Sequence, residues 1–223
     1  MKRSTRIVSV LTCPILLGSP ALTLTEDELV QRGAVRLSAV WRWADELAEK
    51  KIHVCWENPT DTNQAGRLVV ERAVAKTWQD HSRLDFWGWE GCEQHTSGIR
   101  IVVADVRPGL RVPYLGREID GRPRGMRLNF TFQNFASGCT VGTPETWIAR
   151  IAVHEFGHAI GFTHEQNRAD TPDTCTALKE GSTPDKELTP WDDKSIMNYC
   201  YCEGNAELSA MDIDAVQQIY GAR

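Results

Sequence analysis

The histidine-rich run from His154 to His164 (HEFGHAIGFTH) constrains this 223-residue chain more than any other segment. Positions i and i+4 of a helix share one face, so His154 and His158 are expected to project side by side. Gly161 can adopt a left-handed backbone conformation and end that helix, which lets the chain turn and bring His164 back to the same point. Three of the six histidines would then converge.

Three imidazoles around one point form the protein ligand set of an open catalytic zinc site, in which water is the fourth ligand. Zinc lowers the pKa of such a water toward about 7. Glu155 adjoins the first histidine and is expected to act as general base on that water and then as general acid. Histidines packed on an amphipathic helix are the simpler alternative, but the spacing of all three favours the metal site.

The chain continues beyond the third histidine with Glu165, and further along it reads Ser195-Ile196-Met197-Asn198-Tyr199. The motif HExxHxxGxxH with a later methionine resembles the signature of the metzincin zinc peptidases. A glutamate directly after the third histidine, and Tyr199 two residues after Met197, resemble the astacin branch of these enzymes. The resemblance covers about residues 147–221.

The resemblance implies a metzincin-like α+β fold. Such a fold has a twisted mixed five-stranded sheet with two long helices in an upper lobe, and an irregular lower lobe with a C-terminal helix. It also implies one catalytic zinc ion, with Tyr199 as an additional metal ligand and a catalytic group that stabilises the oxyanion. The metal ligands would be His154, His158, His164 and Tyr199.

The resemblance further implies a zinc-dependent endopeptidase whose polypeptide substrate binds in extended form along an edge strand of the sheet. By order along the chain we assign this edge strand to residues 112–116. Pro113 is compatible with an edge strand but not with a central one.

Hydrophobic patterns predict the elements around the histidine helix. Strands are expected at 51–57, 84–89, 99–106 and 126–132, and helices at 24–50, 67–78, 147–162 and 211–220. A loop-rich stretch separates the last two helices. This order predicts an α+β or α/β domain.

The first 21 residues have the pattern of a secretory signal peptide. A basic start precedes a mostly apolar run at 7–17, and small residues at 19–21 provide a cleavage site. The run is too short to span a bilayer, which needs about 20 apolar residues. We therefore expect a secreted or periplasmic protein, with a signal peptide at 1–21 and a catalytic domain at 49–223. Residues 22–48 would be either a short pro-segment or an N-terminal helix.

Removal of the signal peptide would leave six cysteines. An even number in an exported chain predicts up to three disulfides, with fifteen possible pairings. A zinc–thiolate cluster is disfavoured, because Cys200-x-Cys202 is not the CxxC pair of structural zinc sites. The six cysteines are Cys55, Cys92, Cys139, Cys175, Cys200 and Cys202.

The formal net charge of −5 argues against nucleic-acid binding, which requires a basic face. We therefore expect a monomeric endopeptidase without a membrane span or a nucleic-acid partner. Two alternatives stay open: a zinc hydrolase of cell-wall peptide or amide bonds, and a secreted zinc-binding protein without turnover. Glu155 argues against the second, because a pure binding site has no use for a base.

Overall fold

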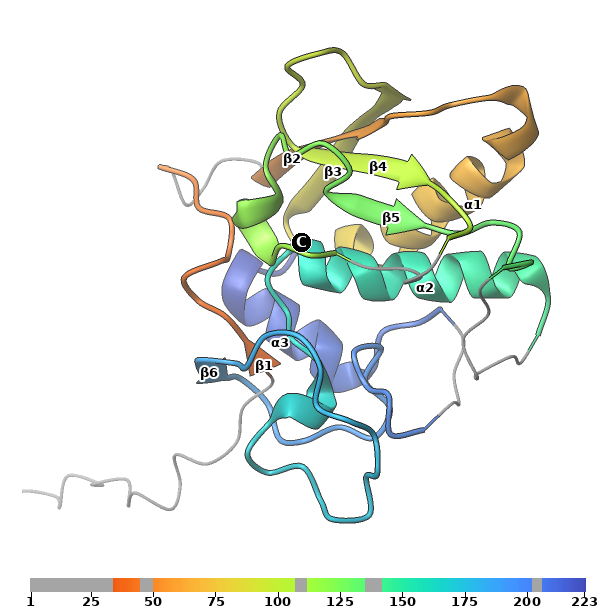
Figure 1. The fold of residues 1–223 in the computed structure, drawn as a ribbon. Coiled ribbons are helices and arrows are strands. Elements are labelled where there is room, and N and C mark those ends of the chain that lie inside the picture. The colour runs from red at the N-terminus through yellow and green to blue at the C-terminus, as the bar shows by residue number, and fades with distance from the viewer. Residues whose placement is uncertain (1–33, 45–49, 107–111, 135–141, 202–205) are drawn as a thin grey trace, which may run out of the picture. The chain divides into compact units, whose positions relative to one another are not determined.

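The computed structural model describes residues 34–44, 50–106, 112–134, 142–201 and 206–223 (Figure 1). The predicted signal peptide lies outside these residues, and so do residues 22–33 and 45–48 of the predicted 22–48 segment. Two of the six cysteines, Cys139 and Cys202, also lie outside them.

A four-stranded parallel sheet forms one side of the domain. Its order is β3-β2-β4-β5, and every neighbouring pair is parallel. All four predicted strands are confirmed, although β5 is shorter than expected because Asn129 Oδ1 accepts the next backbone N–H groups and turns the chain. The strands are β2 (Lys50–Trp56), β3 (Leu84–Gly91), β4 (Ile99–Val103) and β5 (Met126–Leu128).

The expected edge strand at 112–116 is wrong within the described residues, so the sheet there has four parallel strands and not five mixed ones. Pro113 has no N–H to donate to a ladder. Gly116, with φ of +53°, starts the 3₁₀ turn η4 (Gly116–Ile119). The Arg117 N–H donates to the carbonyl of Ala39 at 2.7 Å, which ties this turn to the N-terminal segment. The chain therefore bends where a strand was expected.

Three helices are confirmed. The first, α1 (Gln64–Val74), continues into a π-helical turn, η3 (Ala75–Gln79). The second, α2 (Pro144–Ala159), begins at Thr143, whose hydroxyl accepts a backbone N–H and which is followed by a proline at the first helical position. The third, α3 (Ala210–Tyr220), begins with a reciprocal capping box between Ser209 and Asp212. In Figure 1, α2 runs between the sheet and α3.

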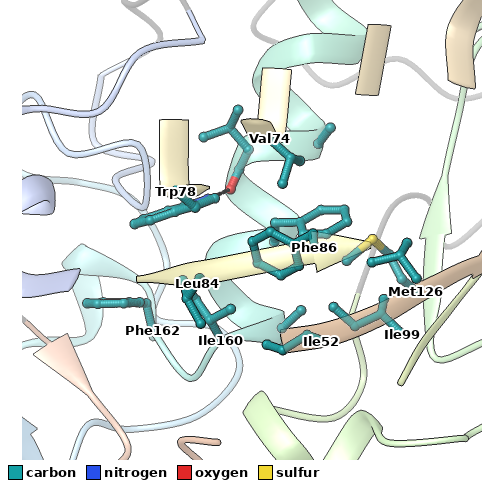
Figure 2. Packing of buried hydrophobic residues seen from close by; sticks show 14 of the residues in the cluster. Ile52, Val74, Trp78, Leu84, Phe86, Ile99, Met126, Ile160 and Phe162 are labelled. Atoms are coloured by element: carbon teal, nitrogen blue, oxygen red, sulfur yellow. Dashed lines mark hydrogen bonds between the residues drawn. The ribbon is translucent and has the colours of Figure 1, made fainter. Parts of the chain in front are cut away.

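The hydrophobic core lies between the sheet and the helices α1 and α2 (Figure 2). Trp78 is fully buried, stacks on Phe162 with ring centroids 5.5 Å apart, and donates its indole N–H to the carbonyl of Val153 at 2.8 Å. Gly157 lets the turn that contains Met197 lie close to α2, because a Cβ at position 157 would collide with the sulfur of Met197. Each large apolar side chain buried in this way contributes about 1.5–3 kcal/mol.

The predicted helix at 24–50 is wrong over its described part, residues 34–44. Here β1 (Ala34–Val35) pairs antiparallel with β6 (Lys186–Glu187), and Val35 also bridges to Phe162. The Trp41 indole donates to the carbonyl of Ala159 at 2.8 Å. These long-range contacts outweigh the local helix pattern, so the segment forms a short strand and a turn and packs against the end of α2.

Two disulfides lie among the described residues, Cys55–Cys92 and Cys175–Cys200, which bears out the expectation of disulfides for four of the six cysteines. Among the described residues, no helix is both long and apolar enough to cross a bilayer.

Candidate metal centre

Three histidines converge, as the sequence predicts. His154 and His158 lie on one face of α2, and Gly161, with φ of +104°, ends the helix so that His164 returns. The Nε2 atom of His164 lies 3.2 Å from that of His154 and 3.0 Å from that of His158. Tetrahedral zinc with bonds of 2.0–2.1 Å needs ligand nitrogens about 3.3 Å apart. These two distances, in a group whose ligand atoms all lie within 4.8 Å of one another, fit one zinc ion.

The other ring nitrogen of each histidine is bound by a backbone carbonyl. His154 Nδ1 lies 2.8 Å from the oxygen of Ile196, and His158 Nδ1 lies 2.8 Å from that of Phe162. His164 Nδ1 lies 2.9 Å from the oxygen of Glu180. A carbonyl only accepts hydrogen bonds, so each Nδ1 carries the proton and each Nε2 presents a lone pair. All three rings are thus held in the neutral form, with their Nε2 atoms directed at one another.

Burial favours the same protonation state. It lowers the pKa of His154 well below its usual range and that of His158 to about 3, with the neighbouring imidazoles adding to the effect. Burial also lowers the pKa of His164. Neutral imidazole is the form that binds a metal. The cluster is therefore ready to bind a cation at neutral pH.

Glu155 is buried, directly follows His154 in the chain, and interacts electrostatically with Tyr199. Burial raises its pKa to about 8, and a hydrogen bond from the backbone N–H of Val112 acts in the opposite direction. Its Oε2 atom has no hydrogen-bond partner among the described residues. A buried polar atom without a partner is costly, and it indicates a missing ligand or water. A nearby cation would favour the ionised carboxylate.

Tyr199 lies against the first histidine. Its ring stacks on His154 with centroids 4.8 Å apart and an interplanar angle of 14°. Its hydroxyl lies 2.9 Å from His154 Nε2, and desolvation of that hydroxyl, with the Glu155 carboxylate nearby, raises its pKa, although Tyr199 as a whole is partly exposed. The phenol is therefore protonated at neutral pH and points at the same place as the imidazole nitrogens.

The turn that contains Met197 is held by α3. One carboxylate oxygen of Asp212 accepts the Ser195 hydroxyl at 2.7 Å, and the other accepts the Ile196 N–H at 2.9 Å. The carbonyl of the same Ile196 accepts a hydrogen bond from His154. Ile196 therefore links Asp212, at the start of α3, to the first histidine.

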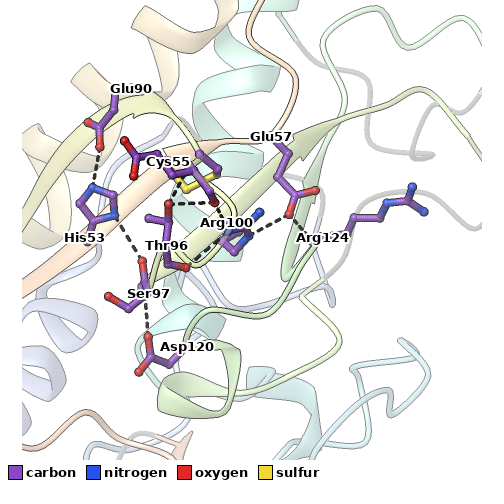
Figure 3. Close-up of a disulfide and its surroundings, with 12 residues drawn as sticks. His53, Cys55, Glu57, Glu90, Thr96, Ser97, Arg100, Asp120 and Arg124 are labelled. Carbon is purple, nitrogen blue, oxygen red and sulfur yellow. Dashed lines mark hydrogen bonds and ion pairs between the residues drawn. A yellow bond between two sulfur atoms is a disulfide. The ribbon is translucent and has the colours of Figure 1, made fainter.

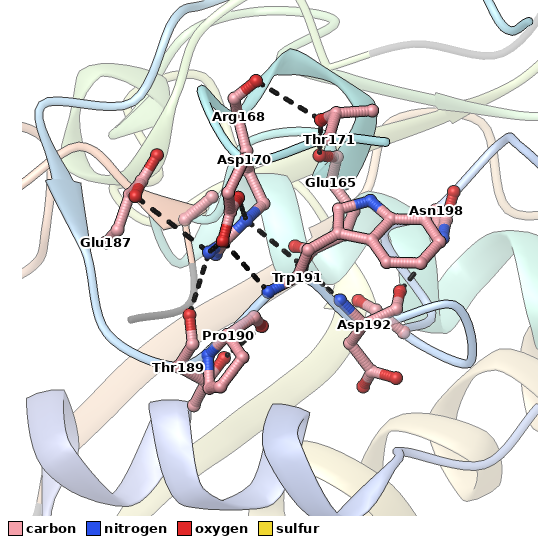
Figure 4. Close-up of polar contacts among 12 residues, drawn as sticks. Glu165, Arg168, Asp170, Thr171, Glu187, Thr189, Pro190, Trp191, Asp192 and Asn198 are labelled. Carbon is pink, nitrogen blue, oxygen red and sulfur yellow. Dashed lines mark hydrogen bonds and ion pairs between the residues drawn. The ribbon is translucent and has the colours of Figure 1, made fainter. Parts of the chain in front are cut away.

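A buried arginine supports the other side of the site (Figure 4). Arg168 is fully buried, and its guanidinium contacts Asp170 at 2.7 Å, Glu165 at 3.4 Å and the carbonyl of Thr189 at 2.8 Å. Glu165 also accepts the backbone N–H of Asp192 at 2.9 Å. These contacts join the chain after His164 to the segment that leads into the methionine turn.

The predicted site residues all come together, namely His154, Glu155, His158, His164 and Tyr199. The carbonyls that orient the histidines had no signal in the sequence, because every residue has a carbonyl. The carboxylate of Asp212 could have been found, since Ser209-x-x-Asp212 is a capping pattern at the start of a predicted helix.

Comparison with protein families and relatives agrees with this geometry. The model of the Astacin peptidase family matches residues 144–186. Nematocyst expressed protein 6 of Nematostella vectensis is 25% identical over 240 residues, which cover 95% of this chain and 75% of that protein. Bone morphogenetic protein 1 of Xenopus laevis is 26% identical over 119 residues, which cover 53% of this chain and 14% of that protein.

Two solved structures share the fold. Myroilysin has a TM-score of 0.59 at 22% identity, covering 86% of this chain and 100% of that structure. The hatching enzyme zinc-protease HCE-1 of Oryzias latipes (medaka) has a TM-score of 0.52 at 20% identity, covering 83% and 96%. The α+β metzincin-like fold is thereby confirmed. Together with the family match over residues 144–186 and the group of three histidines, this fold supports a zinc metalloendopeptidase that is similar to the astacin peptidases.

Proposed function

We propose that His154, His158 and His164 bind the single zinc ion, that Tyr199 is a further ligand, and that Glu155 is the general base and acid. The observation that carries this assignment is the convergence of three Nε2 atoms whose partner nitrogens are all engaged by carbonyls. When bound, zinc supplies Lewis-acid chemistry that acidifies water and polarises the scissile carbonyl.

The chain's own groups then carry the proton and the developing charge. Glu155 takes a proton from the attacking water and passes it to the leaving amine. The Tyr199 hydroxyl, which stays protonated, donates a hydrogen bond to the oxygen that becomes negative in the transition state. Its stacking on His154 keeps the hydroxyl in place for this role.

We further propose that the peptide substrate lies extended along residues 112–115. Two observations support this position. The Val112 N–H reaches the carboxylate of Glu155, so the segment passes beside the general base. Leu115 has the extended φ and ψ of −94° and 135°. A peptide could pair with this main chain even though the segment is not a strand in the absence of substrate.

We propose a secreted monomer whose first 21 residues are a signal peptide. The two disulfides support an oxidising compartment. The proposed catalytic domain at 49–223 also takes in residues 34–44, because Val35 and Val40 are buried in its core. This packing favours an integral segment at 34–44 over a removable pro-segment.

The assignment is tested with Glu155→Ala and His158→Ala, and with Glu145→Ala on the exposed first turn of α2 as the matched control. Glu155→Ala should keep one zinc per chain and lose most peptidase activity, whereas His158→Ala should lose zinc as well. The control should behave as wild type. Near-normal turnover of the Glu155→Ala protein would refute the general-base role.

A further inference from the structure

The disulfide Cys175–Cys200 lies close to the metal centre along the chain. It joins residues 25 positions apart, and the segment between them contains Glu180 and Ile196. The carbonyls of these two residues orient His164 and His154, respectively. Cys200 also directly follows Tyr199. One covalent bond therefore closes the segment that orients two of the three histidines and carries the tyrosine.

This segment has little regular structure to hold it. The strand β6 is its only helix or strand among the described residues, and it is two residues long. The Glu180 carbonyl is held by the Asn167 side-chain amide at 2.6 Å, and the Cys200 N–H donates to the Asn198 side chain at 2.7 Å. Asn167 also accepts the Glu180 N–H at 3.1 Å and donates to the Ser182 carbonyl at 2.9 Å. Loops held by side-chain contacts and not by a backbone ladder open locally at a lower cost in free energy than the sheet.

The second disulfide, Cys55–Cys92, has a different setting (Figure 3). Cys55 is fully buried in β2, and the Cys92 N–H donates to the Trp56 carbonyl at 2.9 Å. The paired strands β2 and β3 hold the two cysteines near each other without the bond. Close to this disulfide, Arg100 pairs with Glu57 at 3.1 Å. This neighbourhood belongs to the sheet and not to the loops that orient the three histidines.

We propose that Cys175–Cys200 is a positioning disulfide of the metal centre: it keeps the Glu180 and Ile196 carbonyls and Tyr199 in the arrangement that binds zinc. This inference rests on the proposed zinc role of the three histidines. A disulfide can act on two quantities, the stability of the fold and the zinc affinity of the folded protein. Any disulfide stabilises the fold by restricting the unfolded chain, and more so for a longer loop. Only a positioning disulfide also raises the zinc affinity of the folded protein.

The loop lengths make the two disulfides a matched pair. The loop closed by Cys55–Cys92 is the longer one, with a separation of 37 against 25. Chain entropy alone therefore predicts that loss of Cys55–Cys92 destabilises the fold at least as much as loss of Cys175–Cys200. A larger loss of zinc affinity on removing the shorter loop's bond would be a separate, local effect.

The experiment compares Cys175→Ala/Cys200→Ala with Cys55→Ala/Cys92→Ala in the full chain. Zinc affinity is measured by competition with a chromogenic chelator, and unfolding by urea. Cys175→Ala/Cys200→Ala should bind zinc at least about tenfold more weakly, as when groups that orient metal ligands are lost. The control should lose stability and keep the wild-type zinc affinity. Unchanged zinc affinity in Cys175→Ala/Cys200→Ala, or an equal loss in both, would overturn the proposal.

His158→Ala in the otherwise wild-type protein keeps the two hypotheses apart. Tight zinc binding by that variant would overturn the proposed metal site, whatever the disulfide variants do. If a double variant does not fold, the native protein is treated with an increasing concentration of a phosphine reductant, which carries no zinc-binding thiol. Its open cysteines are mapped by alkylation and mass spectrometry, and zinc release is followed. Release that tracks the opening of Cys175–Cys200 supports the proposal, and release that tracks Cys55–Cys92 contradicts it.

Discussion

The two sides of α2 are held together in different ways. On one side, four parallel strands and α1 form a regular ladder over a continuous core of residues such as Ile52, Ile101 and Phe86. On the other side, the described part of residues 161–209 contains one two-residue strand and one short 3₁₀ turn. Hydrogen bonds from side chains to the backbone hold these loops in place. We therefore expect substitutions on the sheet side to act mainly on stability, and substitutions on the loop side to act mainly on the geometry of the metal centre. The two properties should respond to different substitutions.

Trp78→Ala tests the sheet side and should have the largest effect. It removes a fully buried indole and its hydrogen bond to Val153, so the free energy of unfolding should fall by about 3–5 kcal/mol. Urea unfolding measures this change. Trp87→Ala, at a half-exposed position in β3, is the control and should cost far less. Equal losses for the two would contradict the burial argument.

Tyr199→Phe tests the loop side. With three histidines as the proposed zinc ligands, zinc content should be unchanged while kcat falls on the order of 10²-fold with a smaller change in KM. Tyr201→Phe is the matched control, because Tyr201 packs against Trp191 and not against the histidines. A wild-type kcat in the folded, zinc-loaded Tyr199→Phe protein would show that the tyrosine only packs.

Asp212→Asn tests the link between α3 and the loop side. It weakens the charged hydrogen bonds to Ser195 and Ile196, so unfolding should become easier by about 1–2 kcal/mol and zinc affinity should fall. Asp214→Asn, on the exposed face of the same helix, should change neither. Zinc affinity that stays constant in Asp212→Asn would show that the Ile196 carbonyl does not depend on this cap.

Asp105→Asn should have the smallest effect, at the end of the sheet. Desolvation acts to raise the pKa of Asp105, but hydrogen bonds from Thr131, Gln133 and Asn129 outweigh it and lower the pKa to about 2. A lowered pKa stabilises the fold above the unfolded value of about 3.9, and this stabilisation is lost as the pH falls toward 2. The stability difference between wild type and variant should therefore shrink between about pH 4 and pH 2 in urea unfolding. A difference that stays constant would contradict the carboxylate's role.

The sequence predicts the centre of this molecule better than its periphery. The histidine spacing requires a helix and a turn at Gly161, and hydrophobic periodicity locates four strands and three helices. The helix expected at 24–50 and the strand expected at 112–116 were wrong because distant partners decide both. Val35 pairs with β6 and Phe162, and the turn at Gly116 is tied to Ala39. Neither partner can be seen in a local pattern.

The end of α2 has one more consequence. Trp41, from the first described segment, binds the Ala159 carbonyl, and the Tyr220 hydroxyl, from the last helix, donates to the Ile160 carbonyl at 2.6 Å. Tyr220 also accepts the Trp41 N–H at 3.3 Å. Segments far apart in the sequence thus close the same helix end, two residues beyond His158. Amide hydrogens in residues 39–41 and in α3 should therefore exchange with solvent through one shared local opening. A fusion partner that displaces either segment should also disturb the end of the helix that carries His154 and His158.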